Sequence, residues 1–340
     1  MRVLRLPSLA IFYAHAARGE TIKNALEIHG VRKSFAGHVA VRDLSLTVPR
    51  GAVYGLLGPN GAGKTTTIRM ILNVIIPDGG VITVLGHAST DAKVNNRVGY
   101  LPEERGLYRK MKVRSVLRFL GALKGMSRRE ADRRIDEWLD RLALRTPDKD
   151  WGNAKVDELS RGMQQKVQFI GTMLHDPELV ILDEPFSGLD PVNAQAMKDT
   201  VVDLRRRGHT VLFSTHLMDQ AERMCDNVCI IAGGGKVLDG EMGDVKASHG
   251  SRTIALSVDG DAGDIGGVLR DPQLVARADD HTRFYEIELH EDADPQDLLR
   301  RVLDAGVRVN RFELVQPSLH QIFLERVGAR GIEEGMSGHG

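Results

Sequence analysis

The stretch GPNGAGKTT occupies residues 58–66 and fits the pattern G-x-x-x-x-G-K-[ST], which is typical of loops that hold nucleotide phosphates. Gly58 and Gly63 let the backbone curl until several N–H groups point inward at one anion. Lys64 then reaches the terminal phosphates, and Thr65 offers its hydroxyl to a magnesium ion. The sequence therefore predicts a nucleotide and Mg²⁺ site, and its loop residues are Gly58, Pro59, Asn60, Gly61, Ala62, Gly63, Lys64, Thr65 and Thr66.

The segments on both sides of this loop agree with that prediction. AVYGLLG at 52–58 indicates a buried strand, and KTTTIRMIL at 64–72 indicates a helix. The positive N-terminal end of such a helix faces the bound phosphates. A glycine-rich turn that binds nothing is the alternative, and it would need neither flank.

The composition describes a globular chain. Its 340 residues are 42% hydrophobic, which is enough for about two domains. The 46 basic and 46 acidic residues cancel, so no overall field attracts nucleic acid, and we expect no nucleic-acid partner. Cys225 and Cys229 are too few for a disulfide scaffold and have no nearby His at a metal-ligand spacing. They are expected to be packed thiols in a reducing compartment.

The N-terminal residues 1–17 imitate a signal peptide. Arg2 and Arg5 precede a short apolar stretch, and Ala14-His15-Ala16 imitates a cleavage site. No apolar run approaches the roughly 20 residues that a membrane-spanning helix needs. Because a nucleotide site needs cytosolic ATP, residues 1–24 are predicted to be a loosely ordered extension or the product of an upstream start codon. The protein is expected in the cytoplasm.

The first half of the chain predicts a β-hairpin followed by a region of strands and helices. Residues 25–48 alternate polar and apolar side chains around a turn at 34–37, which indicates antiparallel strands. Phe35 lies in that turn, where an aromatic ring either packs or stacks on an adenine. Ser160 is placed to cap a helix. The further elements expected are strands at 81–86 and 97–101 and helices at 127–144 and 160–174.

Two later strands end in polar residues. LVILDEP at 179–185 indicates a fully buried parallel strand that ends in Asp183 and Glu184. Adjacent carboxylates at the carboxyl end of a strand beside a phosphate loop indicate a site for magnesium and water. TVLFSTH at 210–216 delivers His216 to the same kind of edge, although a lone histidine there is more often an ordinary loop residue.

The pattern changes after residue 251. The order strand, helix, strand, strand, helix, strand and a final helix predicts a small α+β domain of ferredoxin-like type, and nothing in it indicates catalysis. The expected organisation is an extension at 1–24, an α/β nucleotide-binding domain at 25–247, an accessory domain at 250–328 and a flexible, Gly-rich tail at 329–340.

Five motifs in order resemble one family. The phosphate loop, LSRGMQQKV, LVILDEP, SGLD and STH together resemble the nucleotide-binding subunit of an ATP-binding cassette (ABC) transporter over residues 25–247. That resemblance implies a P-loop ATPase fold with a parallel-sheet core, an antiparallel β subdomain and a helical subdomain. YLPEERGLY, LSRGM and the ending PSLHQIFLERVG are most similar to the sodium-efflux (Nat-type) exporter ATPases, whose permeases are separate chains.

The resemblance assigns a role to each motif residue. It implies that Phe35 stacks on adenine and that Asp183 supports the magnesium ion together with Thr65. It makes Glu184 the general base that polarises the attacking water, with Lys64 stabilising charge. His216 takes the position of the switch histidine that contacts the γ-phosphate.

A further set of residues is implied to act on a second subunit. Ser160, Gly162 and Gln164 resemble the signature motif, which closes over the nucleotide of the other subunit, and residues 187–190 resemble a loop that touches it. The start of the helix after Ser160 is itself an anion site. Since the chain holds one half-site of each kind, we expect a head-to-tail homodimer that encloses two ATP molecules.

Two residues depart from the family pattern. Glu103 stands where most members have Gln, at a position that senses magnesium and the attacking water, so Glu103 is expected among the catalytic and metal-binding residues. Its negative charge needs an offset from magnesium or Arg105. Arg161 replaces the first glycine of the signature and is expected to point away from the nucleotide.

The hypothesis is an ATPase subunit of an exporter. ATP binding closes the dimer, and a separate membrane permease docks near residues 103–125. One alternative is a soluble ABC-type ATPase that acts as a clamp on ribosomes or DNA. Another makes the accessory domain a ligand sensor. The sequence does not identify the cargo.

Overall fold

The computed structural model describes residues 23–104, 106–248, 253–259, 265–281, 284–290, 292–315 and 317–336. The chain forms two compact units: residues up to Gly240 together with those from Arg330 form the first, and Glu241–Ala329 form the second. The predicted N-terminal extension lies outside the described residues up to residue 22. Among the described residues, no helix has the length and apolar character needed to cross a bilayer.

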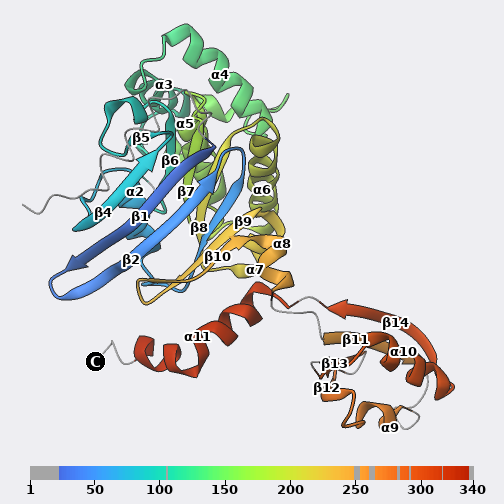
Figure 1. Ribbon diagram of the computed structural model, residues 1–340. Helices are drawn as coiled ribbons and strands as arrows, with labels where there is room; N and C mark the ends of the chain where they lie inside the picture. Colours follow the sequence, from blue (N-terminus) through green and yellow to red (C-terminus); the bar gives the residue numbers. More distant parts are fainter. Residues whose placement is uncertain are drawn as a thin grey trace, which may run out of the picture. The chain divides into compact units, whose positions relative to one another are not determined.

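A six-stranded sheet forms the centre of the first unit, in the order β10-β9-β3-β8-β7-β6 (Figure 1). Parallel pairs join β3 to β8 and β9, and β7 to β8 and β6. All residues of β3, β7 and β8 are buried, as expected for parallel strands covered on both faces. The strands are β3 (Val53–Leu57), β6 (Val98–Leu101), β7 (Leu179–Asp183), β8 (Thr210–Thr215), β9 (Asn227–Ala232) and β10 (Gly235–Glu241).

Helices lie against this sheet on the segments that join its strands. Contacts join α2 to β7, α5 to β6, and α6 to both β3 and β8. Because β3, β7 and β8 are parallel neighbours, the segments that follow them emerge at one edge. The helices and short 3₁₀ turns are α2 (Lys64–Ile71), η1 (Ala92–Val94), η2 (Trp151–Asn153), η3 (Val156–Glu158), α5 (Arg161–Met173), α6 (Pro191–Arg206) and α7 (Met218–Met224).

An antiparallel sheet supports the phosphate loop from outside. It has the order β2-β1-β4-β5, with β1 paired antiparallel to β2 and β4, which confirms the predicted hairpin. Leu26 and Ile28 of β1 share one hydrophobic core with Leu56 of β3 and Ile68 of α2. The loop is therefore fixed at both flanks. The strands are β1 (Asn24–Phe35), β2 (His38–Pro49), β4 (Gly79–Val84) and β5 (His87–Ala88).

A helical block is inserted between β6 and β7. It contains α3 (Val113–Leu123) and α4 (Arg128–Arg141), which lead into α5. The Ser127 side chain caps α4 by accepting a hydrogen bond from the Glu130 N–H, as predicted. The sequence analysis did not predict α3, although Val113, Val116 and Leu117 are buried at helical spacing.

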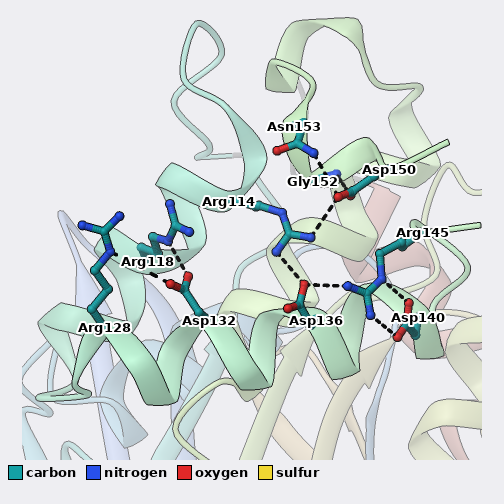
Figure 2. A network of polar contacts seen from close by, with 10 residues as sticks. All are labelled: Arg114, Arg118, Arg128, Asp132, Asp136, Asp140, Arg145, Asp150, Gly152 and Asn153. Atoms are coloured by element: carbon teal, nitrogen blue, oxygen red, sulfur yellow. Dashed lines mark hydrogen bonds and ion pairs between the residues drawn. The ribbon is translucent and has the colours of Figure 1, made fainter.

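A network of ion pairs holds the helical block together (Figure 2). Asp136 of α4 accepts hydrogen bonds from Arg114 of α3 at 2.6 Å and from Arg145 at 2.9 Å. Arg114 also donates to Asp150 at 2.9 Å, in the segment after α4. The Arg114 side chain is only 15% exposed, so solvent screens these contacts less than it screens ordinary surface pairs.

Removing the shared carboxylate charge of Asp136 is expected to weaken this block. We predict that Asp136→Asn lowers the free energy of unfolding by about 1–2 kcal/mol, because Arg114 and Arg145 lose a charged acceptor. The measurement is the thermal unfolding midpoint of the full chain at low and high salt, where the difference should shrink with salt. Glu137→Gln is the matched control, since its partner Arg133 is exposed. An equal effect of both substitutions would contradict the prediction.

The second unit has a four-stranded sheet in the order β12-β13-β11-β14, with antiparallel pairing throughout. This is the strand order of a split βαβ fold, so the ferredoxin-like prediction is confirmed. Its core includes Leu256, Ile287, Leu298 and Val302. The elements are α8 (Met242–Ala247), β11 (Thr253–Asp259), α9 (Gly266–Leu269), β12 (Val275–Asp280), β13 (Tyr285–Leu289), α10 (Pro295–Asp304), β14 (Arg308–Val315) and the part of α11 (Leu319–Met336) up to Ala329.

Two boundaries differ from those expected. Helix α8 belongs to the second unit, whereas the sequence placed it in the nucleotide-binding domain. Helix α11 continues to Met336, into the segment 329–340 that was expected to be a flexible tail. Residues 337–340 lie outside the described part.

Candidate nucleotide-binding site

The phosphate loop needs glycine at two positions for steric reasons. Gly58 has φ 151°, and a Cβ there would lie 2.1 Å from the Ile231 carbonyl oxygen. Gly63 has φ 102°, and its Cβ would lie 2.4 Å from the Ala40 carbonyl oxygen. No other residue fits either position without moving the neighbouring backbone. Gly63 directly precedes α2, whose first N–H groups have no partner within the helix and so face the loop.

Lys64 is a buried cation at the centre of the site. Its side chain is 7% exposed, and Nζ donates to the carbonyl oxygens of Gly58 at 2.8 Å and Pro59 at 3.1 Å. Nζ also lies 3.6 Å from Oε1 of Glu184. Burial lowers the pKa of Lys64, while the charges of Glu184, Asp183 and Glu103 act in the opposite direction. The positive charge is thus held where the loop would receive a phosphate.

Asp183 ends β7 with one carboxylate oxygen satisfied and the other not. Its Oδ1 accepts hydrogen bonds from the Ser214 hydroxyl and, at 3.4 Å, from the Thr65 hydroxyl. Its Oδ2 is buried and has no hydrogen-bond partner among the described residues. A buried, unpaired carboxylate oxygen is costly, and a cation would compensate it. Asp183 and Thr65 therefore fit Mg²⁺, which prefers such oxygen ligands.

The protein offers only part of a magnesium coordination shell. Within the described ranges there is no cluster of three or more His, Cys, Asp or Glu side chains that could hold a metal ion. Mg²⁺ is commonly bound by one or two protein oxygens together with phosphates and water. The donor set at Asp183 and Thr65 is therefore suited to a magnesium–nucleotide complex rather than to a resident metal.

Glu184 has an unusual backbone that orients its carboxylate. Its φ is 47°, in the left-handed region that costs a non-glycine residue about 1 kcal/mol or more. Its N–H donates to the carbonyl oxygen of Ser214 at 3.2 Å and to the Ser214 hydroxyl at 3.1 Å, which holds this conformation. Oε1 then lies 3.0 Å from Nδ1 of His216. The arrangement can orient a water molecule at the strand edge.

Other predicted residues lie elsewhere on the first unit. Phe35 is 43% exposed, and Nζ of Lys33 lies 5.3 Å from its ring centroid. Ser160 caps α5 through the Met163 N–H, and Gln164 donates to the Leu159 carbonyl oxygen at 2.9 Å. A Cβ on Gly162 would meet Asn193 at 2.6 Å, so α5 and α6 approach closely there.

Direct contacts join some of the predicted residues to one another, whereas others make no such contact with the phosphate loop. Lys64, Thr65, Asp183, Glu184 and His216 form one connected group through the contacts above. Within the described part, no hydrogen bond or ion pair joins the remaining predicted residues to the phosphate loop. Those residues are Phe35, Glu103, Ser160, Gly162 and Gln164.

Ser214 is a functional residue that the sequence analysis missed. It is fully buried in β8, directly opposite Asp183 in the β7–β8 register. Its hydroxyl contacts both the carboxylate of Asp183 and the N–H of Glu184. In the sequence, Ser214 could have been noticed as a hydroxyl residue at the end of a buried strand, two positions before His216.

The residues of this site define the class of protein to which the chain belongs. A glycine loop before a helix, a buried lysine, and two carboxylates at the carboxyl edge of a parallel sheet are the parts of a P-loop nucleotide-hydrolysing site.

Comparisons with known proteins place the chain within that class. The ABC transporter family profile matches residues 41–187, and a profile for the C-terminal domain of DrrA1-3-like ATP-binding proteins matches residues 240–327. The chain is 42% identical over 304 residues to the ABC transporter ATP-binding protein YhaQ of Bacillus subtilis (strain 168), covering 89% of this chain and 99% of that protein. It is 32% identical over 308 residues to the Nod factor export ATP-binding protein I of Rhizobium sp. (strain N33), covering 90% and 98%.

A solved structure agrees with these matches. The ATP-binding subunit of an ABC transporter superposes with a TM-score of 0.60 at 30% identity, covering 66% of this chain and 93% of that one. The chain belongs to the family of ABC transporter ATP-binding proteins. It is accordingly a nucleotide-binding ATPase.

Adding a side chain at Gly63 is expected to disrupt the phosphate loop and with it nucleotide binding. We predict that Gly63→Ala weakens ATP binding at least about a hundredfold, because the new Cβ collides with the Ala40 carbonyl and displaces the loop. Fluorescent-nucleotide titration is the measurement.

The matched control for Gly63→Ala is Gly208→Ala. Gly208 has φ 89°, but a Cβ there meets nothing within 4 Å, so it reports backbone strain alone. ATP binding by Gly63→Ala equal to that of Gly208→Ala would contradict the steric argument.

Proposed function

We propose that this chain is the ATPase subunit of an exporter, and that ATP-driven closure of a homodimer energises a separate membrane permease at the cytoplasmic face. The proposal rests on the contacts among Lys64, Glu184 and His216. Glu184 has a strained backbone, and its buried carboxylate lies between the other two side chains, beside the phosphate loop. The export direction is supported by the relative named a Nod factor export ATP-binding protein.

Each residue of the site has a role in this proposal. Lys64 and the N-terminal N–H groups of α2 bind the terminal phosphates. Thr65 and Asp183 would hold Mg²⁺, which when bound neutralises charge on the β- and γ-phosphates. Glu184 orients a water molecule in line with the γ-phosphorus. Because Nδ1 of His216 faces Glu184, its Nε2 is left to contact the γ-phosphate.

The remaining motif residues act across the dimer in this proposal. Ser160, Gly162 and Gln164 lie at the N-terminus of α5, which is a second anion site without contact to the phosphate loop of its own chain in the described part. A two-fold, head-to-tail pair lets each chain complete the other's site, with residues 187–190 at the contact. Phe35, with its exposed ring, stacks on the adenine.

A groove on the first unit is the proposed docking site for the permease. A cavity of about 440 Å³ lies between the sheet and the helical block, and Leu72, Leu107, Leu120 and Leu123 are among its lining residues. Leu123 is 66% exposed. This apolar surface continues the segment 103–125, and an apolar helix end of the membrane subunit suits it.

Neutralising Glu184 is expected to separate binding from hydrolysis. We predict that Glu184→Gln keeps ATP affinity within about threefold, lowers kcat at least about a hundredfold and accumulates an ATP-bound dimer. Steady-state ATPase assays and analytical ultracentrifugation measure the two effects. Glu178→Gln is the control, because Glu178 lies at the opposite end of β7 and pairs with Arg50 and Arg97. Near-normal turnover by Glu184→Gln would remove Glu184 from the role of base.

A pull-down tests the transport role. Tagged Glu184→Gln protein is incubated with detergent-solubilised native membranes, magnesium and ATP, and co-purifying chains are identified by mass spectrometry. We expect a polytopic membrane protein in stoichiometric amount, lost with Leu123→Glu and kept with Glu137→Gln. Recovery of ribosomes or nucleic-acid proteins alone would instead favour a soluble clamp.

A further inference from the structure

Glu103 and Arg161 are charged side chains that the fold leaves unpaired. Both are exposed, and neither has an ion-pair or hydrogen-bond partner for its side chain among the described residues. Glu103 follows β6, and Arg161 is the first residue of α5. Neither charge is therefore compensated by a direct partner within the described part of its own chain.

Glu103 adds negative charge to the phosphate site. Its charge acts on Lys64, where it raises the pKa against the larger effect of burial. It also contributes to the raised pKa of Tyr100, about 12, although burial of the phenol is the main cause. With Asp183 and Glu184 already present, a third carboxylate repels the phosphates that Lys64 attracts. A further cation would relieve this repulsion.

Arg161 is a cation in an unfavourable position. The positive end of the helix dipole disfavours a cation in the first turn, and that turn of α5 holds no acidic residue. No ion pair joins Arg161 to Glu103 within the described part of one chain. Gln168 of α5 donates to the carbonyl oxygen of Glu104 at 3.1 Å, and Arg161 lies seven residues earlier, about 10 Å along the helix axis from that contact.

The sequence led us to expect that Arg161 points away from the nucleotide. We propose instead that Arg161 of one copy forms an ion pair with Glu103 of a second copy when ATP closes the dimer, once at each of the two sites. The inference rests on the proposed head-to-tail dimer, in which the start of α5 closes over the other chain's phosphate loop. The two added charges then cancel, so Glu103 no longer repels the γ-phosphate. The pair exists only in the closed state, and it makes dimer closure dependent on salt.

A double-mutant cycle tests the pair. Glu103→Gln, Arg161→Gln and their combination are made in the Glu184→Gln protein, and the dimer dissociation constant in ATP is measured by analytical ultracentrifugation. We expect Arg161→Gln to weaken the dimer about tenfold when Glu103 is present and hardly at all together with Glu103→Gln. This difference should shrink at high salt, and Arg161→Lys should restore part of the affinity.

The matched control is a second cycle with Glu104→Gln in place of Glu103→Gln, which should show no coupling to Arg161. Equal effects of Arg161→Gln with and without Glu103→Gln, in a protein that still dimerises in ATP, would overturn the pair and leave the proposed function standing. A Glu184→Gln protein that stays monomeric in ATP would overturn both.

Cross-linking gives a second measurement that does not depend on affinity. A Glu103→Cys protein is mixed with an Arg161→Cys protein and treated with a short bis-maleimide. The native Cys225 and Cys229 are buried, and burial raises the pKa of each thiol, so they react slowly. We expect an inter-chain product in the mixture with ATP and none without ATP or with either protein alone. Absence of that product from an ATP-bound dimer would refute the contact.

Discussion

The buried ammonium of Lys64 beside two buried carboxylates is the constraint on which the rest of the site depends. Removing three charges from water is costly unless each is hydrogen-bonded. The carbonyl oxygens of Gly58 and Pro59 hold Lys64, and Ser214 contacts both Asp183 and the backbone of Glu184. These contacts exist only because β3, β8 and β7 are parallel neighbours. The strand order of the sheet is therefore a condition for assembling the nucleotide-binding site.

The parts of the fold that were predicted correctly have local signals. The phosphate loop is a contiguous motif, β7 is an unbroken apolar run, and Ser127 with Glu130 marks the start of α4. Ser214 has no such signal, because its role depends on lying opposite Asp183 across two strands. The α3 helix was missed because its short apolar stripe follows a loop and carries no cap: Lys112 at its N-cap makes no side-chain hydrogen bond.

Two kinds of interaction stabilise the first unit: apolar packing in the sheet and ion pairs in the helical block. The sheet core consists largely of apolar residues with almost no exposure, so its stability does not rest on ion pairs that salt can screen. The helical block adds charged contacts among Arg114, Asp136, Arg145 and Asp150, which weaken as ionic strength rises (Figure 2). The helical block therefore depends on charged contacts more than the sheet core does.

The α5 helix is joined firmly to β6 and to the segment after it. Thr172 donates to the Tyr100 carbonyl oxygen, Gln168 donates to that of Glu104, and a Cβ on Gly99 would lie 2.7 Å from the Thr172 carbonyl oxygen. Any shift of the chain at residues 103–104 must carry α5 with it or break these hydrogen bonds. An α-helix is stiff over the three turns back to Ser160. Movement of the chain at residues 103–104 thus becomes displacement at the N-terminus of α5, where Ser160 lies.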